Sequence, residues 1–181
     1  MKVPSDWSLD GRFIIYQQTD PKTKRDIWVL PLFGDKKPFP FLQTEANEGG
    51  ARISPDGRWM AYTSDALGGY EVHIQSFPER GGLRQVSTGG GIGPNWRRDG
   101  KELFYYALDG KLIAVEVKTG ASFEMGSPHA LFEFSSGNQV AYIAPYTVTA
   151  DGQRFLINTL VDESGGAPLT VVINWQAGLK R

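Results

Sequence analysis

The chain contains no cysteine, which excludes disulfide bridges, thiolate metal sites and a cysteine nucleophile. It contains only two histidines, His73 and His129, and His129 has no serine or acidic partner at a recognisable spacing. Neither sign of charge is in surplus, because 19 basic and 20 acidic residues leave a net charge of −1. Nucleic-acid-binding proteins usually carry a basic surplus, so we expect no nucleic-acid partner.

Long apolar runs are also missing. No stretch approaches the roughly 18 apolar residues that cross a bilayer, and the first residues show no apolar core of a signal peptide. No segment sustains apolar residues at i, i+3, i+4 and i+7 over three turns, so helices are not expected. The 22 glycines and 11 prolines are spread along all 181 residues, which indicates many short strands joined by tight turns.

A repeat built on the dipeptide Asp-Gly organises the chain. Its glycines are Gly11, Gly57, Gly100 and Gly152, which lie 46, 43 and 52 residues apart. Asp-Gly between two apolar runs indicates a β-hairpin, because glycine adopts positive φ without strain and aspartate bonds nearby backbone. The spacing matches the period of roughly 40–50 residues that propeller blades show.

Each repeat continues in the same order after its turn. The second strands are predicted at 13–16, 59–62 and 103–106, the third strands at 27–30, 72–75, 112–115 and 170–173, and short fourth strands near 39–42, 84–87 and 130–134. In the second repeat Glu71, His73 and Gln75 alternate with apolar residues, which predicts a strand that is exposed on one side. Trp7 and Trp96 share one repeat position, which favours packing between neighbouring sheets over ligand stacking.

Four-stranded antiparallel sheets repeated around an axis form a β-propeller. The sequence therefore predicts an all-β, partial β-propeller with four blades, at about residues 3–43, 48–88, 92–134 and 143–175. The fourth blade offers three strands, and no spare strand precedes Val3 to complete it. We expect further blades before residue 1 in the natural protein. We also expect this chain by itself to self-associate through its open edges, for example as a two-fold pair with eight blades.

The turn sequences resemble those of a known family. The segments SPDGR at 54–58 and MAYTSD at 60–65 resemble the repeat signature of TolB-like, WD-related propellers. Residues 85–105 also resemble the C-terminal propeller half of bacterial Ser/Thr kinase-associated sensor proteins. The resemblance implies a bacterial module that binds proteins or gates a separate catalytic domain, and it favours the cell envelope or periplasm.

Candidate catalytic groups are few. The chain has no Gly-x-Ser-x-Gly elbow, no kinase motif and no phosphate-binding loop, and the glycine-rich segment 89–93 is expected to be a crossover between blades. His73 is expected on the surface and His129 in a loop. We therefore expect no catalytic residue, no metal site and no cofactor, and the chain is not expected to be an enzyme by itself.

The best candidates for a binding site are polar residues in or beside the links between blades. They are Glu45, Asn47, Glu48, Asn95 and Asn138, with Arg52 as a charge that lines the channel. We expect a ligand or protein partner to bind there, at the mouth of the channel. The function predicted is that of a non-catalytic interaction or sensing module of a larger protein. The alternative is a substrate-gating domain of a peptidase or kinase whose catalytic part lies elsewhere.

Overall fold

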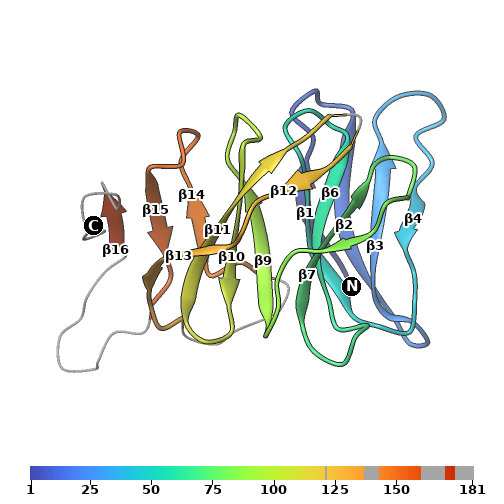
Figure 1. Cartoon of the computed structure of the whole chain (residues 1–181). Helices are drawn as coiled ribbons and strands as arrows, with labels where there is room; N and C mark the ends of the chain where they lie inside the picture. The colour runs from blue at the N-terminus through green and yellow to red at the C-terminus, as the bar shows by residue number, and fades with distance from the viewer. Residues whose placement is uncertain (121, 137–142, 160–169, 174–181) are drawn as a thin grey trace.

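The computed structural model describes residues 1–120, 122–136, 143–159 and, for the backbone, 170–173. Every regular element in these ranges is a β-strand, and the strands form four successive antiparallel sheets (Figure 1). The first two sheets are β1 (Lys2–Trp7), β2 (Phe13–Asp20), β3 (Lys24–Pro31), β4 (Phe39–Leu42) and β5 (Glu48–Ile53), β6 (Trp59–Ser64), β7 (Glu71–Ser76), β8 (Arg84–Gln85). The last two are β9 (Gly91–Trp96), β10 (Glu102–Ala107), β11 (Lys111–Lys118), β12 (Glu124–Met125), β13 (His129–Glu133) and β14 (Tyr146–Val148), β15 (Arg154–Ile157), β16 (Thr170–Ile173).

The third sheet departs from the four-stranded plan. Two short strands take the place of one fourth strand, because β12 pairs with the end of β11 and β13 pairs with its beginning. The single strand predicted at 130–134 is therefore incomplete, since the preceding segment adds β12. His129 is the first residue of β13, and its side chain is exposed. No helix in the described ranges has the length and apolar character of a membrane span.

The four Asp-Gly turns share one geometry, as predicted. Their glycines all have φ of +73°, in the left-handed region where other residues are strained. In the first turn the Ser8 hydroxyl donates to Asp10 at 2.6 Å and accepts the N–H of Phe13 at 2.9 Å. In the third turn Arg97 replaces the hydroxyl, and its guanidinium donates to Asp99 at 2.6 and 2.8 Å. The turn therefore tolerates a different side chain as long as the aspartate keeps a donor.

Three apolar clusters fill the boundaries between successive sheets. At the second boundary Trp59 and Ile74 of the second sheet meet Trp96, Leu103 and Tyr105 of the third. Burial of each large apolar side chain contributes on the order of 1.5–3 kcal/mol. Since β1 contacts β5 and β5 contacts β9, these innermost strands lie side by side around one axis (Figure 1).

The prediction that β7 is exposed on one side is wrong. His73 is 4% exposed and Gln75 is 6% exposed, because the first sheet covers their face of the second. The His73 ring stacks on Tyr62 with 5.8 Å between ring centroids, and Gln75 Nε2 donates to the Tyr62 hydroxyl at 3.4 Å. Burial lowers the pKa of His73. These polar side chains thus belong to the packing between sheets.

Candidate functional site

A pocket of about 250 Å³, here called the mouth pocket, lies where the innermost strands end at the Asp-Gly turns. All four sheets contribute to it. Its rim holds the residue that stands two positions before each turn glycine, namely Leu9, Pro55, Arg98 and Ala150. Arg98 is exposed and is the only charged residue of these four. Repeat-equivalent residues therefore converge on one opening at the axis.

A second set of repeat-equivalent residues that line the mouth pocket is polar. Asp6, Arg52 and Asn95 all line it, and each stands five positions before its turn glycine. The sequence prediction named Arg52 and Asn95 but missed Asp6. The signal that could have found Asp6 is its repeat position, which is the same as that of the two residues named.

Asp6 and Arg52 join the first two sheets. Arg52 Nη1 lies 3.7 Å from Asp6 Oδ1, and the same nitrogen donates to the Ser5 carbonyl. The Ile53 N–H donates to Asp6 Oδ2 at 2.7 Å. Burial raises the pKa of Asp6, whereas the Ile53 N–H and the Arg52 charge oppose that rise. The carboxylate is thus fixed in place, and the guanidinium is held across the boundary.

The walls of the mouth pocket include two tryptophans in different surroundings. Trp96 is 8% exposed, and its indole Nε1 donates to the Arg52 carbonyl of the second sheet at 3.1 Å. Trp7 has the same repeat position but is 62% exposed. The expectation that both pack between sheets is wrong for Trp7, because no preceding sheet covers the first one in the described ranges.

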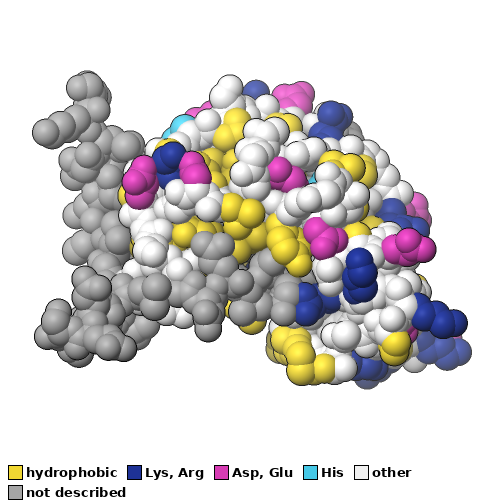
Figure 2. Space-filling model, turned by 90° about the horizontal axis from the view of Figure 1, so that it is seen from below, with side chains coloured by type: hydrophobic (Ala, Val, Ile, Leu, Met, Phe, Trp, Pro, Cys, Tyr) yellow, Lys and Arg dark blue, Asp and Glu magenta, His cyan; other side chains and the backbone are white. Residues whose placement is uncertain are grey.

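The opposite edge of the sheets holds Glu45, Asn47 and Glu48, at the crossover from β4 to β5. Figure 2 views the molecule from below and shows acidic side chains dispersed among apolar and uncharged ones. Asn47 closes the first crossover, since its backbone N–H and side-chain Nδ2 donate to the two carboxylate oxygens of Asp65 at 2.7 and 2.8 Å. Glu45 is exposed and lines an open depression of about 490 Å³, together with Lys24 and Asp65. Asn47 therefore has a structural partner, whereas Glu45 faces solvent.

Glu48, predicted to belong to a binding site beside a link between blades, is the first residue of β5 and is only 2% exposed. The Thr44 hydroxyl donates to Glu48 Oε1, and Oε2 has no hydrogen-bond partner among the described residues. Burial raises the pKa of Glu48 to about 7, and the charges of Asp26 and Asp65 act in the same direction. Glu48 is therefore a buried acid at a boundary between sheets.

The six predicted site residues do not form one site. Arg52 and Asn95 meet in the mouth pocket. Glu48 lies at the other end of β5, about 13 Å from Arg52 at the usual rise per residue of a strand. Glu45 and Asn47 share that opposite edge, and Asn138 lies outside the described residues. No group of three or more His, Asp or Glu side chains within the described residues is arranged to hold a metal ion.

Comparison with known structures identifies the fold of the chain. No family model and no curated protein sequence matches the chain. TolB from Acinetobacter baumannii aligns with 94% of this chain at a TM-score of 0.65 and 21% sequence identity. The fold is that of a TolB-like β-propeller. The aligned part is 40% of that TolB, so the chain spans less than half of its length.

Two further solved structures are similar to this chain. A puromycin-hydrolyzing peptidase from Mycobacterium tuberculosis aligns with 84% of it at a TM-score of 0.58 and 20% identity, over 27% of the peptidase. The periplasmic gluconolactonase PpgL from Pseudomonas aeruginosa aligns with 83% at a TM-score of 0.50 and 16% identity, over 48% of its length. At such identities the likeness shows the fold alone, so each sheet of this chain is a propeller blade.

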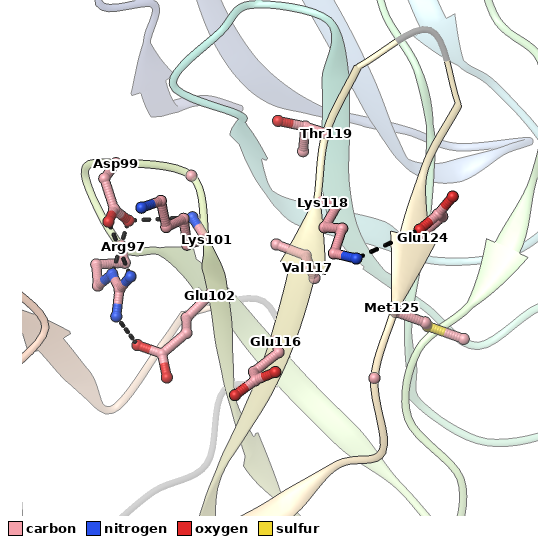
Figure 3. Close-up of a pocket in the computed structure, with 12 residues that line it drawn as sticks. Arg97, Asp99, Lys101, Glu102, Glu116, Val117, Lys118, Thr119, Glu124 and Met125 are labelled. Atoms are coloured by element: carbon pink, nitrogen blue, oxygen red, sulfur yellow. Dashed lines mark hydrogen bonds and ion pairs between the residues drawn. The ribbon is translucent and has the colours of Figure 1, made fainter.

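A third pocket, of about 740 Å³, opens beside the third blade near Glu116 (Figure 3). At the first two blade boundaries an aromatic pair stands at this level, namely Phe13–Phe77 at 5.0 Å and Trp59–Phe123 at 5.3 Å. In the third blade the position of Phe13 and Trp59 is taken by a carboxylate, Glu102.

The charges of this third pocket largely satisfy one another. Arg97 donates to Glu102 at 2.6 Å as well as to Asp99, and Lys118 lies 4.0 Å from Glu124 (Figure 3). Such mutual pairing leaves little net charge to attract a partner. We therefore place the candidate site at the mouth pocket, where Arg98 is exposed and all blades converge.

Proposed function

We propose that this chain is a propeller module that recognises a segment of another protein at the mouth pocket, and that it does so without chemistry of its own. The observation that carries the proposal is the convergence of equivalent residues from four blades on one pocket that polar side chains also line. Loops and strand ends held by a rigid scaffold are where binding residues concentrate.

The size of the mouth pocket favours a side chain over a small molecule. Its volume of about 250 Å³ is below the roughly 300 Å³ at which pockets for drug-sized ligands begin. A partner that anchors one or two side chains there would also cover the apolar rim residues Leu9 and Pro55. Anchors that fill a central pocket dominate the binding energy of many protein interfaces.

The charged side chains of the mouth pocket favour an acidic segment of the partner protein. Arg52 is already paired with Asp6, whereas Arg98 extends from an exposed turn on the rim. A guanidinium presents a planar set of donors that matches a carboxylate. The segment expected therefore carries an aspartate, a glutamate or a C-terminal carboxylate next to an apolar side chain.

Neither histidine lines the mouth pocket, which supports a role in recognition. His73 is buried under the first blade, and His129 is exposed on the outermost strand of the third. The second candidate function is substrate gating for a separate enzyme, of the peptidase or kinase kind. It is favoured by the likeness to a peptidase, of which the aligned part is 27%. The resemblance to kinase-associated sensors remains a prediction from the sequence.

Selection of peptides from a random phage-displayed library on the immobilised chain tests the proposal. We expect the selected peptides to be rich in Asp or Glu beside an apolar residue, and to bind Arg98→Ala at least 10-fold more weakly. Arg58→Ala is the matched control, because Arg58 is exposed at the second turn and does not line the pocket. Equal binding to the wild type and to Arg98→Ala, or no peptide above background, would overturn the proposal.

A further inference from the structure

Two crossovers between blades differ in the acidic side chains beneath them. The first crossover, residues 43–47, joins β4 to β5, and the second, residues 86–90, joins β8 to β9. At the second crossover the Ser87 hydroxyl donates to Glu71 Oε2, and the Gly90 N–H donates to Glu71 Oε1 at 2.9 Å. Both oxygens of that carboxylate are thus hydrogen-bonded by the segment that passes over it.

Asp26 takes the place of Glu71 at the first crossover, since each pairs with the residue seven positions after the turn glycine of its blade. Asp26 is 0% exposed. Its Oδ2 accepts from the Thr23 hydroxyl at 2.8 Å and from Gln43 Nε2 at 3.3 Å, whereas its Oδ1 has no hydrogen-bond partner among the described residues. A buried carboxylate oxygen without a donor is costly, so a further partner is expected there.

The two crossover donors are present but serve other carboxylates. The Thr44 hydroxyl, which has the repeat position of the serine hydroxyl at the second crossover, donates to Glu48 Oε1. The Asn47 N–H, which has the repeat position of the glycine N–H, donates to Asp65 Oδ1 at 2.7 Å. Glu48 and Asp65 therefore use the bonds that the carboxylate of the second crossover receives.

Glu48 and Asp65 are acidic only at the first crossover. The residues in their repeat positions in the third blade are Gly91 and Leu108, which carry no charge. The charges of Asp26 and Asp65 both act on Glu48, and Glu48 Oε2 is a second buried oxygen without a hydrogen-bond partner among the described residues. Three carboxylates thus gather where the second crossover has one, and two of their oxygens are buried without a donor.

An open surface lies beside these carboxylates. The depression of about 490 Å³ is lined by Asp65 and by Thr44, which donates to Glu48. Lys24 also lines it, and its charge acts on Asp65. Within the described residues no ion pair includes Asp26 or Glu48. The depression gives a cation and its water ligands a route toward the two buried oxygens.

We propose that Asp26 Oδ1 and Glu48 Oε2 bind a calcium ion at the boundary of the first two blades. Calcium takes six to eight oxygen ligands in a flexible geometry, from carboxylates and waters among others. Magnesium demands a near-ideal octahedron and binds more weakly at such a site. Because only two carboxylates supply ligands and water from the depression completes the shell, the dissociation constant is expected to be about 0.1–1 mM, as in weak calcium modules.

This site is independent of the mouth pocket, which lies at the other end of β5, so either proposal can fail without the other. The sequence alone predicts no metal site, because Asp26, Glu48 and Asp65 come from separate segments that only the fold brings together. An ion there would hold the first crossover and the first two blades together.

Isothermal titration calorimetry with CaCl₂ at pH 8, on the chain freed of calcium with EGTA and then dialysed, tests the inference. We expect one ion per chain for the wild type and at least 10-fold weaker binding of MgCl₂. Glu48→Gln and Asp26→Asn each remove one charged ligand and are expected to weaken calcium binding at least 10-fold. Glu45→Gln is the matched control, because Glu45 is exposed on the same depression, and it is expected to bind calcium as the wild type does.

Thermal unfolding followed by circular dichroism gives a second readout and checks that each variant is folded. Calcium at ten times its dissociation constant should raise the midpoint of the wild type by about 3–6 °C. The rise should be smaller at pH 6, because protons compete with calcium for Glu48. If Glu48→Gln does not fold, Asp26→Asn decides. A wild type that binds no calcium, a folded Glu48→Gln or Asp26→Asn chain that binds it equally well, or an equal rise with NaCl at the same ionic strength would overturn the inference.

Discussion

Glu48 and Arg52 stand at opposite ends of the same strand, β5, and their surroundings differ. Glu48 is 2% exposed and lies near Asp26 and Asp65. The crossover above it is attached to the second blade by the hydrogen bond from Asn47 to Asp65. Arg52 keeps about a third of its side chain exposed in the mouth pocket. The comparison shows that Glu48 at the crossover edge is enclosed by its neighbours, whereas Arg52 at the turn edge bridges two blades and still keeps part of its side chain open to a partner.

The difference follows from the connections at each edge. Crossovers must carry the chain from an outermost strand back to the axis, so they lie over the strand ends and bury what is beneath them. The Asp-Gly turns join neighbouring strands of one blade, and they leave the axis uncovered. Substitutions at the crossover edge should therefore change the stability of the fold, and those at the turn edge should change binding.

The largest effect is expected from Glu48→Gln. The pKa of Glu48 is about 7 in the fold, against 4.5 for an unperturbed glutamate, so the folded state holds the proton longer than the unfolded state does. This contribution to stability is complete below pH 4.5 and is lost as the pH rises through 7, by about 3 kcal/mol. Gln cannot ionise and should remove this loss.

Urea unfolding of the wild type and of Glu48→Gln between pH 4.5 and 8 measures the effect. The difference between the two proteins is the relevant quantity, because the lowered pKa of His73 acts in the opposite sense, through loss of stability as the pH falls. The matched control is Glu45→Gln, since Glu45 is exposed three residues away. If the free energies of unfolding of the wild type and of Glu48→Gln change in parallel with pH, the pKa of Glu48 is not raised in the fold and the prediction is wrong.

A smaller effect is expected from Asn47→Ala. The substitution removes the Nδ2 bond to Asp65 and leaves the backbone bond. Loss of one hydrogen bond to a carboxylate should lower the free energy of unfolding by about 1.5–3 kcal/mol. Chemical denaturation measures it, with peptide binding at the mouth pocket as the second readout. Weaker peptide binding without a loss of stability would contradict the expectation that the crossover edge governs stability and the turn edge governs binding.

The smallest effect on stability is expected from Asn95→Ala. Asn95 lines the mouth pocket, and its side chain makes no hydrogen bond that we observe among the described residues. The free energy of unfolding should change by less than about 0.5 kcal/mol, as for other surface substitutions. Binding of the selected peptides should nevertheless weaken. A thermal melt and a titration on the same protein separate the two, and a large loss of stability would contradict the comparison.

The sequence predicts the fold well because its signals are local. Asp10 and Gly11 specify a turn through bonds that span a few residues, and the same pair recurs in every blade. The site was only partly predictable. One repeat position holds Arg52, Asn95 and Asp6, and all three line the mouth pocket. The alternating sequence pattern alone does not single out Asp6.

What the sequence could not reveal depends on the neighbouring blade. Glu45 and Glu48 look alike in one polar segment, but only Glu48 lies beneath residues of the first and second blades. The alternation at His73 and Gln75 predicts an exposed face, yet the sheet that covers it comes from residues far away along the chain. Burial by a neighbouring sheet leaves no mark on local periodicity.

The shared position of Asp6, Arg52 and Asn95 has a consequence for how such a protein diversifies. Each of the first three blades contributes one of these side chains to the mouth pocket from a place that the turn does not use, since the turn depends on its aspartate and glycine. Under the proposed function, substitution at that place alters the ligand preference of the module, while the Asp-Gly turns keep their own residues. Duplication or exchange of a whole blade would bring a new residue to this position. Under the proposed function, the binding specificity can therefore change one blade at a time.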